Sequence, residues 1–150
     1  METIELLKKN LLFKGLTADD FELLSGLIKE RQVKPNTTLF SEKMPAEALY
    51  IVKSGKIKIS VMEGEGEEVG LLELGPGEFF GEIALIQESS RAVTARAESA
   101  VEVVMLTRKD FLALLDLDPR VAARIALAIA RLLAMRVKAY SGKLREILLS

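Results

Sequence analysis

Hydrophobic and polar positions change their period twice along this chain. Up to about residue 30 the apolar residues recur at helical spacing, and Thr17 followed by Asp20 has the form of a capping box. The period then falls to two, and it returns to that of a helix after residue 107. The sequence therefore predicts one domain with N-terminal helices over 1–30, a β-region over 31–107 and C-terminal helices over 108–150.

The β-region is predicted to consist of short antiparallel strands. Ile57, Ile59 and Val61 alternate with polar residues, as a half-buried strand requires. Glycine-containing turns separate this strand from its neighbours, a pattern typical of a jelly-roll-like barrel or sandwich. The five other predicted strands lie at 38–41, 49–53, 69–74, 92–98 and 101–106.

The C-terminal region predicts a short helix over 108–115 and a long helix that starts at Asp118-Pro119. The long helix carries an apolar seam with alternating spacings of four and three residues, which is typical of helix pairing between two copies. The alternative is that this helix packs entirely on its own domain, because the first two seam residues are alanines. The seam consists of Ala126, Ala130, Leu133, Val137, Tyr140, Leu144 and Ile147.

Charge is divided unevenly between the body and the C-terminal helix. Residues 1–118 carry 14 Lys and Arg against 21 Asp and Glu, whereas residues 119–150 carry seven against one. The basic segment is therefore expected to contact the acidic body, another copy of the chain or an anion. A net charge of −1 argues against a protein that coats nucleic acid.

Composition excludes several chemistries. The chain has no cysteine and no histidine, which removes disulfides, thiolate metal sites and Ser-His-Asp catalysis. The N-terminus does not resemble a signal peptide, and Arg124 and Arg131 interrupt the most apolar run, 121–135. We therefore expect a cytoplasmic protein with no membrane span and no resident cofactor.

The stretch 79–97 places Glu82 and Arg91 among small and apolar residues. Buried charges are costly unless they are compensated, so either the two side chains form a salt bridge or a ligand lies between them. Three glycines between residues 75 and 81 permit close backbone approach, and N–H groups at the start of the short turn after Glu82 attract an anion. The forked Arg91 side chain suits a phosphate, while Glu82 accepts from a hydroxyl. Together these residues predict a site for a sugar phosphate.

Two segments of this region also carry a specific resemblance: Phe80-Gly81-Glu82-Ile83-Ala84-Leu85 and Arg91-Ala92-Val93-Thr94. They resemble the phosphate-binding cassette of cyclic nucleotide-binding domains, which occur in catabolite activator proteins, regulatory subunits of cAMP-dependent kinase and cyclic nucleotide-gated channels. The similarity covers nearly the whole chain. It implies a double-stranded β-helix, or jelly roll, of eight strands, whereas the pattern alone predicts six.

The resemblance implies a role for each matching residue. Glu82 and the Gly81 backbone would hold the ribose 2′-hydroxyl, and Arg91 would bind the cyclic phosphate together with the N–H groups of Ile83, Ala84 and Ala92. Ile59 and Leu71 would line the purine pocket; as alternatives they are ordinary core residues. Arg136 would cap the base, or it is simply a solvated residue of a basic helix.

Departures from the family pattern leave the charges and glycines in place. Ser90 stands where a proline often precedes the arginine, and Val93 and Ala95 replace commoner residues. Ala92 in place of a threonine resembles the pattern that prefers cAMP to cGMP. The resemblance thus implies a cAMP-binding regulatory module, part of a transcription regulator or channel, in which the ligand moves the final helix and favours a homodimer.

Besides this cAMP-binding module, three other interpretations remain open. The next in order is a structural module of the same fold with an empty pocket. An enzyme is the third, although nothing near Glu82 resembles an activated nucleophile. A nucleic-acid role for the basic helix is weaker, because no DNA-binding domain is recognised within the chain.

Overall fold

The computed structural model describes residues 2–149, and within the last helix the side chains at 140, 141 and 143–149 lie outside the described part. The helical elements are α1 (Thr3–Lys8), the 3-10 turn η1 (Leu11–Phe13), α2 (Ala18–Ser25), α3 (Ile83–Ile86), α4 (Arg108–Leu117) and α5 (Pro119–Leu149). The strands are β1 (Lys29–Val33), β2 (Thr38–Phe40), β3 (Ala48–Ser54), β4 (Ile57–Glu63), β5 (Glu67–Leu74), β6 (Phe79–Phe80), β7 (Thr94–Ala97) and β8 (Val101–Thr107).

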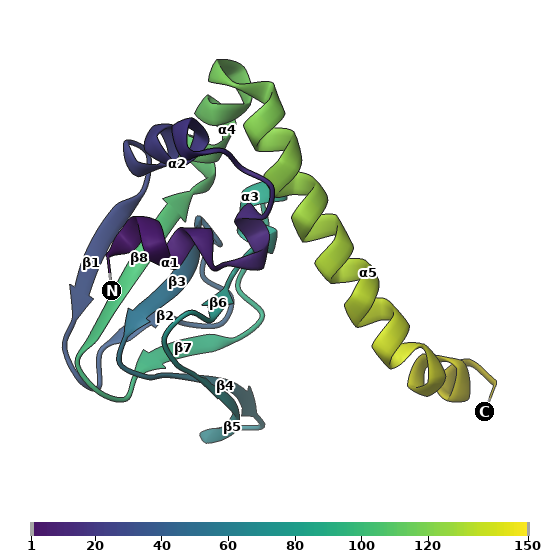
Figure 1. The fold of residues 1–150 in the computed structure, drawn as a ribbon. Helices are drawn as coiled ribbons and strands as arrows, with labels where there is room; N and C mark the ends of the chain where they lie inside the picture. Colours follow the sequence, from purple (N-terminus) through teal and green to yellow (C-terminus); the bar gives the residue numbers. More distant parts are fainter. Residues whose placement is uncertain (1, 150) are drawn as a thin grey trace.

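The strands form two four-stranded antiparallel sheets, in the orders β1-β8-β3-β6 and β2-β7-β4-β5. The crossing connections make a jelly roll, with N-terminal helices and α4 on one side and α5 running away from the body (Figure 1). The predicted fold class, a jelly roll with N-terminal helices and a long C-terminal helix, is confirmed.

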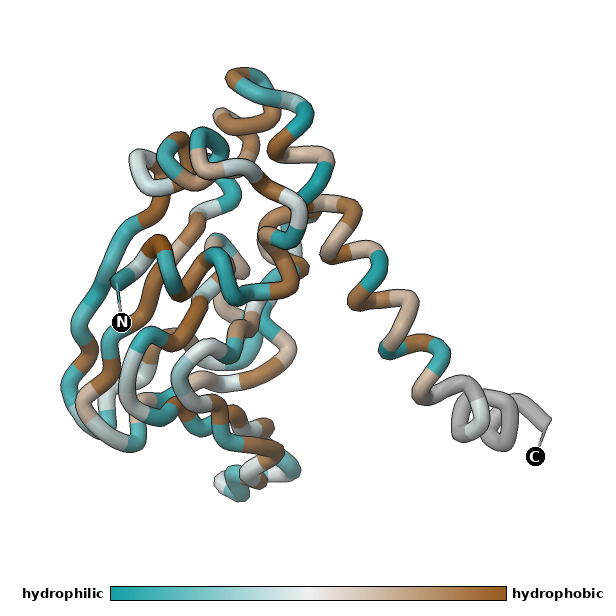
Figure 2. Tube along the Cα trace, viewed as in Figure 1, coloured by the Kyte–Doolittle hydropathy of each residue, from teal (hydrophilic) through white to brown (hydrophobic). Residues whose placement is uncertain are grey.

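Strand β3 separates two hydrophobic cores because its side chains alternate between the faces of the sheet. Tyr50 and Val52 face the interior of the roll, whereas Leu49 and Ile51 pack against the helices. Figure 2 shows hydrophobic residues concentrated along the strands and helices of the body. The cassette lies where these two cores meet, since Phe80 belongs to the roll core and Leu85 to the helical core.

Two strands, β1 and β6, are not predicted by the sequence pattern. Four of the five β1 residues are exposed, and the strand lies at the edge of its sheet, so it has no apolar alternation to detect. It begins at Lys29, inside the segment expected to be helical. Strand β6 has only two residues, too few to define a period.

Helix ends follow the predicted capping. Thr17 and Asp20 form the capping box of α2, and the Asp118 carboxylate accepts from the Val121 N–H at 3.3 Å at the start of α5. Arg120 pairs with the buried Asp20, which ties the first turn of α5 to α2. Among the described residues, no helix is both long and apolar enough to cross a bilayer.

Candidate functional site

The predicted cassette residues converge between β6, α3 and the start of β7. Gly81 has a φ of 82°, and a Cβ there would lie 2.6 Å from Arg91 Nη1 and 3.0 Å from the Ala48 carbonyl oxygen. Only glycine accommodates both the backbone conformation and this close approach. The guanidinium of Arg91 therefore lies directly against the backbone that leads into α3.

Arg91 is buried and forms no ion pair with a carboxylate of the described residues. It is 7% exposed, and its Nη2 donates to the Ala48 carbonyl oxygen at 2.9 Å. The guanidinium carbon lies 4.0 Å from the centre of the Phe40 ring, and Tyr50 is the second aromatic neighbour. Desolvation by burial lowers the pKa of Arg91, and the opposing effects of Tyr50 and Glu47 are weaker.

The Nε of Arg91 is buried and has no hydrogen-bond partner among the described residues. An unpaired buried donor costs about 1–3 kcal/mol, more when it is charged. A cation–π contact with an aromatic ring offsets only about 1–2 kcal/mol of the desolvation. An anion bound to the guanidinium would therefore offset the free-energy cost of burying this charge.

Backbone donors extend this anion-binding surface. The N–H groups of Glu82, Ile83 and Ala92 have no backbone acceptor among the described residues. Ala84, also predicted to donate to the phosphate, instead donates to the Gly81 carbonyl oxygen at 3.1 Å. Two of the three N–H groups predicted to bind phosphate are thus available as the turn stands.

Glu82 pairs with Arg136 and not with Arg91. Its side chain is 5% exposed, whereas that of Arg136, which reaches it from α5, is 49% exposed. The sequence left open a salt bridge between Glu82 and Arg91, and the described residues contain none. The carboxylate predicted to hold the sugar is therefore neutralised by the long helix.

The remaining predicted residues lie in contrasting environments. Ile59 is 5% exposed within the roll core, whereas Leu71, at an irregularity in the β4–β5 pairing, is 52% exposed. Leu71 is thus exposed and can contact a ligand at the surface. Ile59 could contact a ligand only from the interior of the roll. Their roles at a purine stay predictions, as does the base-capping role of Arg136.

Sequence reasoning missed Arg108, the first residue of α4. Its Nη1 donates to the carbonyl oxygens of Ala46 at 2.9 Å, and of Ala84 and Gln87, both at 3.3 Å. Its backbone N–H donates to the Glu47 carbonyl oxygen at 2.8 Å. Arg108 therefore connects α4 to the short helix α3 and to residues 46–47. The next residue, Ala48, accepts a hydrogen bond from Arg91. A positive charge at the start of a helix is unfavourable for the helix dipole. This unfavourable position is the feature of the sequence that could have identified Arg108.

Comparison with known families identifies the family of this domain. The sequence profile of the cyclic nucleotide-binding domain matches residues 30–118, which include both sheets and the whole cassette. The chain belongs to the cyclic nucleotide-binding domain family and is related to regulators of the catabolite activator and kinase regulatory-subunit type.

Individual relatives show how this domain is distributed. The cyclic AMP receptor protein of Thermus thermophilus is 35% identical over 125 residues, which cover 83% of this chain and 58% of that protein. Glutaminase 1 of Bradyrhizobium diazoefficiens is 32% identical over 142 residues, 95% of this chain but 22% of that protein. The chain thus spans between about a fifth and three fifths of the length of these relatives.

Solved structures agree with the fold. The N-terminal domain of a transcriptional regulator from Streptomyces coelicolor superposes with a TM-score of 0.81 at 31% identity, covering 89% of this chain and 94% of that one. The regulatory domain of a Toxoplasma gondii kinase, crystallised with cAMP, gives 0.67 at 34% identity, covering 73% of this chain and 42% of that one.

Proposed function

We propose that this chain is a cAMP-responsive sensor module that reports nucleotide binding through the position of α5. The observation that carries the proposal is Arg91: a buried guanidinium whose Nε has no partner among the described residues, next to N–H groups that have no backbone acceptor there. Hydrogen bonds to charged groups contribute about 1.5–3 kcal/mol each, so this set supplies a large share of the roughly 8 kcal/mol of micromolar affinity.

In this proposal each ligand group has its own protein partner. The cyclic phosphate binds Arg91 with the N–H groups of Ile83 and Ala92, and the N–H of Ala84 joins them if the turn opens. The ribose 2′-hydroxyl donates to Glu82. The purine lies against Leu71, and cAMP is preferred because position 92 is alanine and not threonine.

Glu82 provides the proposed link to α5. In this proposal the ribose hydroxyl takes Oε1 of Glu82, the oxygen that accepts from Arg136, and Arg136 leaves the carboxylate. Arg136 released in this way is free to cap the base. A ligand that displaces this contact shifts the equilibrium between two positions of α5. The free energy of that shift equals the difference between the binding free energies of the ligand for the two positions.

Isothermal titration calorimetry with cAMP, cGMP and cyclic dinucleotides tests the proposal. We expect saturable binding of cAMP that Arg91→Ala abolishes and Arg91→Lys weakens. Arg96→Ala is the matched control: Arg96 lies on β7, pairs with Glu68 and should leave affinity unchanged. Absence of cAMP binding by the wild-type chain, or equal binding by Arg91→Ala, would contradict the proposal.

We also propose that the exposed seam of α5 pairs with a second copy. Val137 is 65% exposed and Ala130 is exposed, whereas Ala126 and Leu133 pack partly on their own core. Tyr140, Leu144 and Ile147 lie outside the described side chains. Sedimentation equilibrium of wild-type and Val137→Lys chains should show a dimer that the substitution weakens; a wild-type monomer with and without cAMP would exclude this part.

The second candidate is a structural module with a closed pocket. It is favoured by the ion pair between Glu82 and Arg136, which already satisfies the carboxylate. It predicts no nucleotide binding by wild type, so the same titration separates the two functions. We infer a cytoplasmic binding role and not catalysis, and intact cAMP after prolonged incubation with the protein is the expected result.

A further inference from the structure

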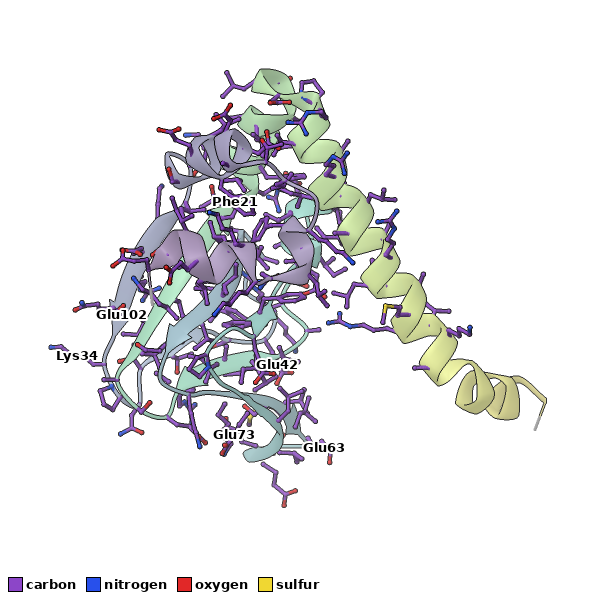
Figure 3. The ribbon with its side chains drawn as sticks, in the orientation of Figure 1. Phe21, Lys34, Glu42, Glu63, Glu73 and Glu102 are labelled. Atoms are coloured by element: carbon purple, nitrogen blue, oxygen red, sulfur yellow. The ribbon has the colours of Figure 1, made fainter. Side chains whose placement is uncertain are left out.

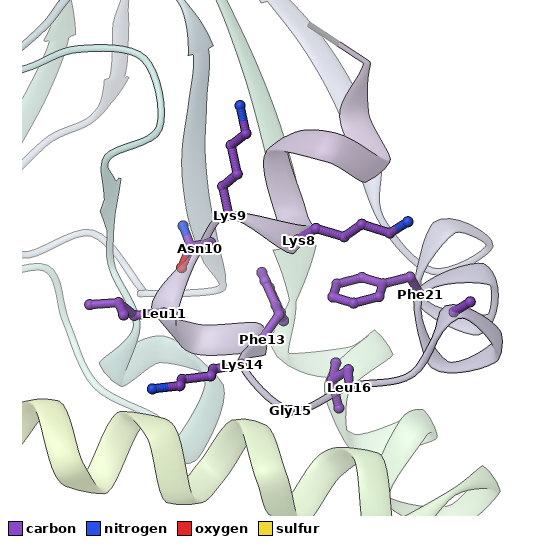
Figure 4. Close-up of a pocket in the computed structure, with 10 residues that line it drawn as sticks. Lys8, Lys9, Asn10, Leu11, Phe13, Lys14, Gly15, Leu16 and Phe21 are labelled. Carbon is purple, nitrogen blue, oxygen red and sulfur yellow. The ribbon is translucent and has the colours of Figure 1, made fainter.

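A groove outside the nucleotide site lies between η1 and α5, and Phe79 of β6 also lines it. Its volume is about 280 Å³. Three large apolar side chains on it are strongly exposed: Leu11 at 67%, Leu127 at 48% and Met135 at 66%. Figure 4 shows Leu11 and Lys14 on the part of the N-terminal turn that lies over α5.

The same groove is lined by three cations, Lys14, Arg124 and Arg131. No acidic residue lines it, and none of the three forms an ion pair with a described residue. This distinguishes them from Lys53, Arg96, Arg108, Arg120 and Arg136, all of which pair with carboxylates of this chain.

We propose that this groove binds an acidic amphipathic helix of a partner protein. Arg124 and Arg131 are seven residues apart, about two turns or 10 Å along α5, while Lys14 follows η1. A helix laid over the mouth of the groove, along α5, presents leucines to the exposed apolar residues and carboxylates, also seven residues apart, to the two arginines. A nucleic-acid backbone would satisfy the cations but leave Leu127 and Met135 against phosphate or water.

The groove shares structure with the cassette. Phe79 precedes Glu82 by three residues, and Met135 is followed directly by Arg136. A helix bound in the groove would therefore hold α5 in the position that pairs Arg136 with Glu82. This step rests on the proposed function: if cAMP displaces Arg136, helix binding and cAMP binding oppose each other by the same factor in both directions.

Fluorescence anisotropy with a synthetic 18-residue peptide tests the docking. The peptide carries leucines at positions i, i+4, i+7 and i+11, flanked by glutamates, and is titrated with the full nucleotide-free chain. We expect saturable binding that falls at least tenfold in Arg124→Glu/Arg131→Glu and in Leu127→Ser. A second peptide with lysine in place of glutamate should show the reverse preference and bind the charge-reversed variant.

Arg31→Glu/Lys34→Glu is the matched control, because it makes the same charge change at exposed residues of another surface; Figure 3 labels Lys34 there. Equal losses in this control, or an unchanged affinity in Leu127→Ser, would reduce the effect to general electrostatics and overturn the proposal. Tighter binding of duplex DNA, of phosphatidylserine vesicles or of a second copy in sedimentation would also overturn it.

Saturating cAMP tests the opposition separately. We expect it to weaken peptide binding at least threefold in wild type and not at all in Arg91→Ala. An unchanged peptide affinity in a protein that calorimetry shows to bind cAMP would overturn the opposition. If the chain binds no cAMP, the proposed function fails, while the peptide measurements without nucleotide still decide the docking.

Discussion

Two arginines reach the same cassette from different regions of the molecule, and they are held in opposite ways. Arg91 comes from the roll, is 7% exposed, and rests on aromatic rings and a carbonyl oxygen. Arg136 comes from α5, has a side chain that is 49% exposed, and pairs with Glu82. The roll therefore contributes a buried cation that forms no ion pair within the described part of the chain, and the helix contributes a cation that already has a carboxylate partner.

This difference assigns separate tasks to the two regions. A buried, preorganised guanidinium can provide affinity, because the cost of desolvating it has already been met in folding. In the pair of Glu82 and Arg136 the arginine end is half-exposed, so a ligand can replace it, and the loss of the contact can report that the ligand has arrived. Variants of the roll, of α5 and of the contact between them therefore separate these tasks.

Gly81→Ala should have the largest effect, on the roll side. The added Cβ would lie 2.6 Å from Arg91 Nη1 in a residue with positive φ. We expect stability to fall by about 1–3 kcal/mol from the backbone conformation and cAMP affinity to fall more than tenfold. Urea unfolding and calorimetry measure the two effects.

Gly77→Ala is its control. Gly77 has a φ of 87°, but a Cβ there would meet nothing within 4 Å. It should therefore lose comparable stability and keep its affinity. Similar losses of affinity in both variants would show that backbone strain, and not displacement of Arg91, controls the site.

Arg108→Gln should act between the two regions. Removing the guanidinium leaves three carbonyl oxygens without this donor, at a cost of about 1–3 kcal/mol. We expect cAMP binding to persist with reduced affinity, but protection of α5 from hydrogen exchange to respond less to cAMP. A full response of α5 in this variant would show that α4 is not the connection; Lys109→Gln serves as the control.

Most of the fold was accessible from the sequence, because alternation in β4 and helical spacing in α2 and α5 directly reflect burial. The missed strands were those with no buried face or too few residues. At the site, the types and spacing of Glu82 and Arg91 indicated a sugar phosphate. The partner of Glu82 was not accessible, since Arg136 is 54 residues away and its approach depends on the path of α5.

Arg136→Gln should have a smaller effect, confined to the helix side. The Glu82 end of this ion pair is buried, so its loss costs about 1–3 kcal/mol, and exchange of α5 amides near residue 136 should rise at least about fivefold without nucleotide. Adding cAMP should then change their exchange less than in wild type. Arg131→Gln controls for charge on the same helix. An unchanged response to cAMP in Arg136→Gln would show that the contact between Arg136 and Glu82 does not couple the nucleotide to α5.

The smallest effect is expected where α5 begins, at the ion pair of Asp20 with Arg120. The pKa of Asp20 lies below its usual value, first because the Thr17 N–H donates to its carboxylate and further because of Arg120. A depressed carboxyl pKa stabilises the fold above the unfolded value of about 3.9, and that contribution is lost as the pH falls through the lower folded pKa. Asp20→Asn should therefore be less stable than wild type by about 1 kcal/mol near pH 6, with a difference that shrinks below pH ~4.

The measurement is urea unfolding of both chains from pH 6 to pH 3, with and without cAMP. Asp19→Asn, an exposed neighbour in the same turn, should show little difference from wild type. Because the pair of Asp20 and Arg120 lies at the fixed end of α5, cAMP should shift both chains equally, whereas it should shift Arg136→Gln differently from wild type. A nucleotide-dependent change in the Asp20 contribution would mean that α5 moves from its first turn, and the contrast between a fixed start and an exchangeable contact at Glu82 would no longer hold.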